Sequence, residues 1–172
     1  LASEPRWRVG PAITRMHKVL FVSPHLDDAV FSCASRIRRE VKAGDDVTVA
    51  TVFSHARPRS KQSSEYALRR NEDRQALREL GARPCWLGLL DAPWRNPFYN
   101  SFRRIVLETA PDDAAYVEVI RGRLIQLLDR IKPDVTYFPL AVGTHIDHRL
   151  VFAAAVSLPG AIARLYYEDQ PY

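Results

Sequence analysis

The sequence Val-Leu-Phe-Val-Ser-Pro-His-Leu-Asp-Asp occupies residues 19–28, where an apolar run leads directly into a proline, a histidine and two adjacent carboxylates. Apolar residues then recur at the spacing of one helix face, at Ala29, Val30, Cys33, Ala34, Ile37 and Val41. We therefore expect a strand over residues 18–23 and a helix over residues 28–43, with the histidine and both carboxylates where the two meet.

Strand-like and helix-like segments alternate along the rest of the chain. The expected strands cover residues 47–53, 84–90, 134–139 and 164–168, and the expected helices cover residues 64–80, 114–131 and 150–158. This alternation predicts an α/β fold, a Rossmann-like three-layer sandwich with a mostly parallel sheet and helices on both faces. The sequence lacks an initiator methionine and ends after a strand-like run, so we expect a single domain over residues 1–172 that is trimmed at both ends.

Composition and charge narrow the function classes. The 172 residues are 47% hydrophobic and 26% charged, which is ordinary for a globular protein. The net charge is +5, but the arginines are scattered and form no dense basic run, so we do not expect nucleic acid as a partner. We also expect no membrane span, because the apolar runs are too short for one. The two cysteines lie on expected core elements and are interpreted as buried thiols.

The adjacent acids Asp27 and Asp28 repel each other, so the chain is expected to place a positive group beside them. A metal ion is the usual candidate. His25 and Asp28 are three residues apart and project to the same side of a first helical turn, whereas Asp27 points elsewhere. The alternative is that one of the two acids only caps the helix, as many aspartates do.

A second cluster, His145-Ile146-Asp147-His148, follows the expected strand at residues 134–139. Because the carboxyl ends of parallel strands share one edge of a sheet, both clusters are expected in the same crevice. Together they offer three imidazoles and three carboxylates. The alternative for the two histidines is that they are loop residues bonded to the backbone.

These side chains meet the needs of a hydrolytic zinc site. Such a site has three protein ligands and one open position for water, whose pKa the ion lowers toward neutrality. A nearby carboxylate can take a proton and later deliver it to the leaving amine. A further histidine can stabilise the oxyanion that forms.

Two loops and one acidic residue on a helix are further candidates for a place in or beside the crevice. The basic stretch 54–63 and the aromatic loop 91–99 both follow strands, so we expect them to overhang the crevice and to set substrate choice. Glu72 is expected on the inward stripe of its helix with Leu68, Ala76 and Leu80. There it would either form a buried ion pair with a neighbouring arginine or serve the site.

The paired motifs, Pro24-His25-Leu26-Asp27-Asp28 and His145-Ile146-Asp147-His148, resemble those of the LmbE-like, or PIG-L, deacetylases. These zinc-dependent enzymes remove N-acetyl groups from glucosamine-containing substrates. The segments 69–81, 87–91 and 167–172 are also similar to segments of that family, so the resemblance covers most of the chain. Leu26 and Ala29 depart from the family's commonest residues, a proline and a glutamate.

The resemblance implies roles for individual residues. Zinc would be held by His25, Asp28 and His148. Asp27 would act as general base and then acid, and His145 would stabilise the oxyanion. From behind the metal ligands, Asp147 would orient a histidine. At the substrate side, the sugar would be faced by Arg69 and Asp91.

We therefore predict a zinc-dependent hydrolase that removes the N-acetyl or N-acyl group from an amino sugar or a glucosamine-containing conjugate. Metal-bound water would be the nucleophile, and a small amino-sugar compound the partner. The expected location is the cytoplasm of a bacterium. The sequence does not decide whether the chain forms a homo-oligomer. Two alternatives remain: a metal-dependent phosphoesterase or deaminase, and a non-catalytic module that binds polyanions. The ligand set alone does not distinguish zinc from iron.

Overall fold

The computed structural model describes residues 15–57, 60, 62–160 and 162–169. Its strands form one parallel five-stranded sheet in the order β3-β2-β1-β4-β5. The central strand is β1 (Lys18–Ser23), and the others are β2 (Asp46–His55), β3 (Arg83–Leu90), β4 (Val135–Pro139) and β5 (Ala163–Tyr167).

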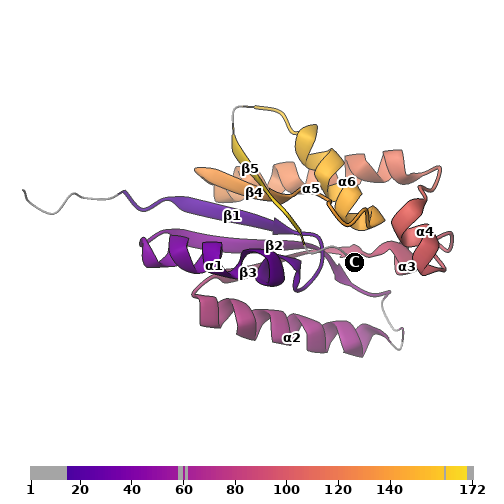
Figure 1. Cartoon of the computed structure of the whole chain (residues 1–172), viewed down its shortest axis with the longest axis horizontal. Helices are drawn as coiled ribbons and strands as arrows, with labels where there is room; N and C mark the ends of the chain where they lie inside the picture. The colour runs from indigo at the N-terminus through magenta and orange to yellow at the C-terminus, as the bar shows by residue number, and fades with distance from the viewer. Residues whose placement is uncertain (1–14, 58–59, 61, 161, 170–172) are drawn as a thin grey trace, which may run out of the picture.

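Helices cover both faces of this sheet (Figure 1). One face carries α1 (Asp28–Lys42) and α2 (Gln62–Leu80), and the other carries α5 (Asp113–Ile131) and α6 (Ile146–Val156). Two short helices, α3 (Ala92–Arg95) and α4 (Phe102–Leu107), lie beyond the carboxyl ends of the strands. The predicted α/β sandwich with a parallel sheet is therefore confirmed.

Alternation along β1 explains why the sheet needs cover on both sides. Val19 and Phe21 pack with α1 and α2, whereas Leu20 and Val22 pack with α5 and α6. All four side chains are at most 1% exposed. A strand that is buried on both faces reads as a continuous apolar run, which is the pattern that the sequence shows.

The central position of β1 also places the site. β1 pairs with β2 on one side and with β4 on the other, where Val19 lies opposite Val135. The chain runs outward from β1 in both directions, so the sheet has its switch point between β1 and β4. Open parallel sheets bind ligands in the crevice at the carboxyl ends of such strands. The loops that follow β1 and β4 carry the two histidine clusters.

The inward stripe expected for α2 was wrong, although Glu72 does line a pocket together with Asp27 and Arg69, beside the site. Glu72 is exposed, and Leu68 is 59% exposed. The buried side chains of α2 are Tyr66, Asp73 and Leu77, so the inward stripe is displaced from the expected one. The sequence misled because a buried aspartate lies on the true stripe, where its carboxylate accepts a hydrogen bond from Trp86 Nε1 at 2.8 Å.

The aromatic loop, the cysteines and the basic stretch differ in part from their expected structures. The segment 91–99 is no open loop, since it begins with α3, and α4 follows it. Both cysteines are free thiols, but only Cys33 is buried, while Cys85 is partly exposed. Residues 58–59 and 61 of the basic stretch lie outside the described residues.

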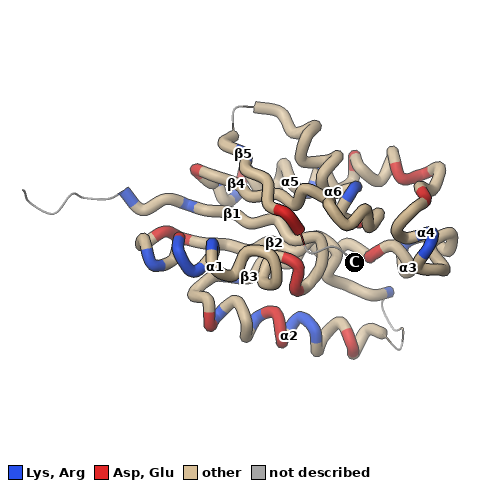
Figure 2. The backbone as a smooth tube through the Cα atoms, viewed as in Figure 1, with Lys and Arg blue, Asp and Glu red and all other residues tan. Residues whose placement is uncertain are grey.

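Charge is mixed along the chain. Basic and acidic residues are interspersed along α1 and α2, which is the pattern of a solvated helix surface (Figure 2). Among the described residues, no helix combines the length and the apolar character needed to cross a membrane.

Candidate active site

Ser23 helps to shape the turn between β1 and α1. Its hydroxyl donates to the backbone oxygen of His25 at 2.7 Å and accepts from the backbone N–H of Ala29 at 3.0 Å. Asp27 stands at the N-cap position but makes no capping hydrogen bond with its side chain. Helix capping therefore does not account for the acid pair.

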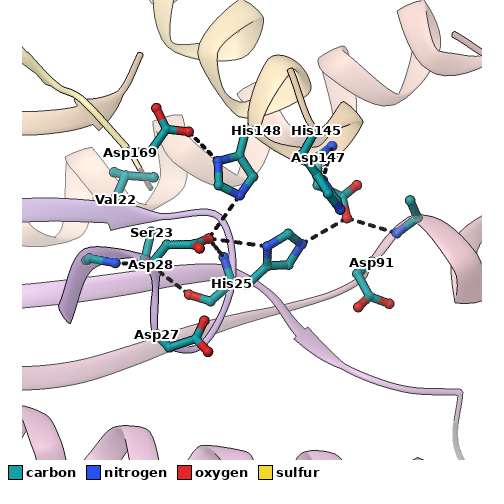
Figure 3. A network of polar contacts seen from close by, with 12 residues as sticks. Val22, Ser23, His25, Asp27, Asp28, Asp91, His145, Asp147, His148 and Asp169 are labelled. Atoms are coloured by element: carbon teal, nitrogen blue, oxygen red, sulfur yellow. Dashed lines mark hydrogen bonds and ion pairs between the residues drawn. The ribbon is translucent and has the colours of Figure 1, made fainter. Parts of the chain in front are cut away.

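Asp28 brings two histidines together. Its Oδ2 accepts from the backbone N–H of His25 at 2.7 Å and lies 3.2 Å from His25 Nδ1 and 3.1 Å from His148 Nε2 (Figure 3). The three potential ligand atoms lie within 4.8 Å of one another. The side chains of Asp28 and His148 are 3% and 1% exposed, so this cluster closes the bottom of the crevice.

Asp147 holds His25 from behind. Its Oδ2 lies 3.1 Å from His25 Nε2 and accepts from the backbone N–H of Ala92 at 2.9 Å. Its Oδ1 accepts from the Arg95 guanidinium at 2.7 Å. The guanidinium stacks on the Tyr116 ring, with 4.5 Å to the centroid. The structure thus places Asp147 where the sequence analysis put it, against a histidine of the cluster.

Asp169 occupies the matching place behind His148. This aspartate follows β5, and its carboxylate is hydrogen-bonded to His148 Nδ1. Neither Asp169 nor Arg95 was predicted from the sequence as a site residue. A usable signal existed for Asp169, because it stands just past the carboxyl end of a strand, where ligands gather in parallel sheets.

Charged partners outweigh burial for the carboxylates of this cluster. Burial alone would raise the pKa of Asp28, but hydrogen bonds from His148 and His25 bring that pKa well below its ordinary value. Burial would likewise raise the pKa of Asp147, but the contacts with His25 and Arg95 bring that pKa below its ordinary value. Between the two carboxylates, the pKa of His25 rises to about 10 although burial opposes the charge. The cluster therefore favours a positive charge at its centre.

The donor set fits a zinc ion. Two imidazole nitrogens and one carboxylate oxygen are a known zinc ligand set that leaves a fourth position open. A second group, His25 with His145 and Asp147, also has its atoms within 4.8 Å. We prefer the group centred on Asp28, because Asp147 already accepts hydrogen bonds from Arg95 and Ala92.

The open side of the crevice carries the other acid of the pair. The Asp27 side chain is 43% exposed, and one of its oxygens lies 3.6 Å from the Arg69 guanidinium. Burial and the neighbouring Asp28 raise the pKa of Asp27, while Arg69 opposes that shift. Asp27 thus lies beside the proposed ligands without belonging to either candidate metal group.

A cleft of about 220 Å³ opens above these side chains, and it is lined by His25, Asp27, Arg69, Asp91, Pro93 and His145. The Tyr66 hydroxyl donates a hydrogen bond to Asp91 Oδ2. Burial raises the pKa of Asp91, and the bond from Tyr66 opposes the shift. The residues that the sequence analysis placed at the sugar therefore do reach the cleft wall.

His145 caps α6 and lines the same cleft. Its Nδ1 accepts from the backbone N–H of Asp147 at 3.2 Å, so Nε2 carries the ring proton in the neutral form. Burial, followed by the nearby His25, lowers the pKa of His145 to about 4. The ring is therefore a neutral hydrogen-bond donor at pH 7. The alternative given for the two histidines, a hydrogen bond to the backbone, is therefore found at His145 Nδ1.

The model of the PIG-L family, described as GlcNAc-PI de-N-acetylase, matches residues 20–158. The chain belongs to the PIG-L family. Two relatives, both named 2'-N-acetylparomamine deacetylase, come from Streptomyces fradiae and Niallia circulans. The first is 32% identical over 98% of this chain and 65% of its own length. The second is 28% identical over 89% of this chain and 66% of its own length.

A solved structure with the same PIG-L fold is the zinc-inhibited form of teicoplanin deacetylase Orf2. It superposes with a TM-score of 0.74 at 26% identity, covering 90% of this chain and 68% of the solved one. The chain thus spans slightly less than two thirds of the length of both deacetylase relatives.

Proposed function

We propose that this PIG-L chain is a zinc-dependent deacetylase that hydrolyses the N-acetyl or N-acyl group of an amino sugar or a glucosamine-containing conjugate. The observation that carries the proposal is the convergence of His25 Nδ1, Asp28 Oδ2 and His148 Nε2 at the bottom of a cleft whose rim holds Asp27. When bound there, zinc supplies a Lewis acid that polarises the acyl carbonyl and lowers the pKa of a water molecule.

Asp27 is proposed as the general base and then the general acid. It takes a proton from the attacking water and delivers it to the nitrogen of the leaving amine, which needs a carboxyl group whose pKa is shifted toward the working pH. Its raised pKa has the right direction for both steps. Asp28 is unsuited to this role, because the two histidines hold its pKa low.

His145 is proposed to stabilise the oxyanion. With Nδ1 occupied by the backbone N–H of Asp147, its Nε2–H can donate to the oxygen that gains charge during hydrolysis. The lowered pKa of this ring keeps it in the neutral form, with a single proton on Nε2 to donate.

Arg69 and Asp91 are proposed to bind the sugar. Both residues line the cleft. The guanidinium of Arg69 can donate hydrogen bonds to sugar hydroxyl groups, and the carboxylate of Asp91 can accept them. Both relatives are named for 2'-N-acetylparomamine, which makes this amino-sugar conjugate the first substrate to test. A cytoplasmic location stays a prediction that cell fractionation would check.

The test measures acetate released from 2'-N-acetylparomamine, N-acetylglucosamine and N,N'-diacetylchitobiose. We expect the protein to carry about one zinc per chain, to lose activity with a chelator and to recover it with added zinc. The Asp27→Asn variant should retain zinc and lose roughly 10²- to 10⁴-fold in kcat, the usual contribution of a general base.

Glu118→Gln is the matched control, because it removes one carboxylate from the outer surface of α5, where Glu118 is 64% exposed. This variant should keep the full rate. Absence of acetate release from every substrate would contradict the proposed activity. An unchanged rate in Asp27→Asn would remove Asp27 from the mechanism while leaving the zinc site intact.

A further inference from the structure

Asp169 lies outside the segment that the PIG-L model matches, since that match ends at residue 158. Its side chain is nevertheless 1% exposed and is inserted behind His148, on the side away from the cleft (Figure 3). A buried aspartate needs partners for both oxygens, because an unpaired buried charge is costly. The partners of Asp169 show what this residue does.

Both oxygens of Asp169 accept hydrogen bonds. Oδ2 is bonded to His148 Nδ1, and Oδ1 accepts from the backbone N–H of Val142 at 3.1 Å. The backbone contact fixes the carboxylate against the loop that follows β4. An ionised carboxylate has no proton to donate, so the proton of this bond must reside on His148 Nδ1.

The position of that proton decides which nitrogen of His148 can bind a cation. With the proton on Nδ1, the lone pair of the neutral ring is on Nε2, which lies 3.1 Å from Asp28 Oδ2. Carboxylates that hold ligand histidines in this way fix both the tautomer and the ring orientation. Asp147 has the equivalent contact with His25, at 3.1 Å from Nε2.

We propose that Asp169 is a positioning residue of the metal site, which fixes the Nδ1–H tautomer of His148 and so directs Nε2 at the ion. The inference rests on the proposed function, because it assumes that the cluster around Asp28 binds zinc. It extends the site past the matched family segment to the residue that follows β5.

An asparagine at position 169 would test the tautomer directly. It has the size of aspartate, but one of its two polar atoms is an NH₂ donor. If that group faces His148, it favours the wrong tautomer. If it faces Val142, two N–H donors oppose each other. The first orientation disfavours the required tautomer and the second loses the contact that fixes the side chain to the loop after β4, so the variant keeps the packing and weakens its hold on His148.

The experiment measures zinc affinity by competition with a chromophoric chelator for the wild type, Asp169→Asn and Asp169→Ala. We expect Asp169→Asn to bind zinc about 10- to 100-fold more weakly, the range for loss of such an outer contact. Asp169→Ala should lose less, because a small cavity does not oppose the required tautomer. Glu168→Gln removes a charge from the exposed neighbouring residue and should bind zinc as the wild type does.

The outcomes separate this inference from the proposed function. If the wild type binds no zinc, both fail. If the wild type binds zinc and Asp169→Asn binds equally well, or if Asp169→Ala is the weaker of the two, only the positioning role is overturned. A packing role alone would make Ala the worse variant.

A measurement on the wild type covers the case in which the variants do not fold. Nitrogen-15 spectra of the zinc-loaded protein should show a proton on His148 Nδ1, shifted downfield by its bond to a carboxylate. A histidine spectrum with that nitrogen unprotonated would overturn the inference without any substitution at Asp169.

Discussion

The buried half and the open half of the candidate site contain aspartates whose pKa values are shifted in opposite directions. In the buried half, the pKa values of Asp28, Asp147 and Asp169 are lowered, although burial alone would raise each of them. In the open half, the pKa values of Asp27 and Asp91 are raised, although both side chains reach the cleft. The sign of the shift therefore follows the partners rather than the depth.

The partners differ in kind between the two halves. Each buried aspartate faces an imidazole at hydrogen-bonding distance, and Asp147 faces a guanidinium as well. Asp27 has an arginine only at 3.6 Å, and Asp91 has a neutral tyrosine hydroxyl. The division suits the proposed chemistry, because a metal site needs fixed anions and proton transfer needs an acid with a shifted pKa.

The largest expected effect comes from removing the cation that supports the buried half. Arg95→Met would leave Asp147, which is fully buried, without its guanidinium partner. We expect the free energy of unfolding to fall by about 3–5 kcal/mol, the usual cost of breaking a buried ion pair from one side. Urea unfolding followed by circular dichroism would measure it.

Arg83→Met provides the matched control. Arg83 also pairs with an aspartate, Asp46 at 2.6 Å, but its side chain is 65% exposed. Exposed pairs contribute about 0–1 kcal/mol, so this variant should unfold close to the wild type. Equal unfolding midpoints for the two variants would mean that the buried half does not depend on its cation.

A smaller effect is expected from exchanging the acids of the adjacent pair one at a time. Asp28→Asn should weaken zinc binding by about a hundredfold or more, since loss of a ligand should exceed the loss of an outer contact. The same change at Asp27 should alter zinc affinity only a few-fold while it abolishes most hydrolysis. Isothermal titration with zinc would compare the two variants. Similar affinities in both would contradict the assignment of Asp28, and not Asp27, as the ligand.

The smallest expected effect is at Asp73 on α2, where the effect of burial on the pKa can be separated from the effect of a hydrogen-bonded charged partner. Asp73 is 6% exposed, but its described hydrogen bond comes from the neutral indole of Trp86. Burial raises the pKa of Asp73, and the bond from Trp86 and the charge of Arg74 only partly oppose the shift. The folded protein therefore holds this proton to a higher pH than the unfolded chain does. The stability that results is present at low pH and is lost as the pH rises through the folded pKa.

Asp73→Asn keeps an oxygen acceptor for Trp86 and removes the buried charge. We expect it to raise the free energy of unfolding at pH 7 by roughly 0.5–1 kcal/mol, the low end for single stabilising changes. The gain should vanish below pH 3.8, the ordinary pKa of the group. Chemical unfolding at pH 3 and at pH 7 would measure both, and a destabilised variant at pH 7 would show that Asp73 is ionised and well solvated.

The fold was predictable because its signals are local and strong. The apolar runs of β1 and β2 and the single apolar stripe of α5 indicate their elements without tertiary information. The four-residue α3 was missed because a helix of about one turn shows no period. The inward stripe of α2 was misassigned because Asp73, a polar residue, faces inward against Trp86.

The site was predictable where two polar residues stand together at the end of a buried strand. His25 with Asp28, and His145 with His148, carry that signal. The signals for Asp169 and Arg95 are weaker, because Asp169 follows its strand beside Glu168 without a histidine, and Arg95 lies in a segment that reads as a loop. Their contacts with His148 and Asp147 depend on how distant elements pack, which no single segment encodes.

One feature of the topology bears on how the protein acquires its ion. His25 and Asp147 are 122 residues apart, yet they touch because β1 and β4 are neighbours in the sheet. A nascent chain that has emerged only as far as β2 presents two of the three proposed ligands. The third proposed ligand, His148, lies on α6, so the ligand set is complete only after β4 has paired with β1 and α6 has packed on the sheet. An ion that binds then stabilises the folded state alone. Zinc would stabilise the completed fold without helping to start its formation.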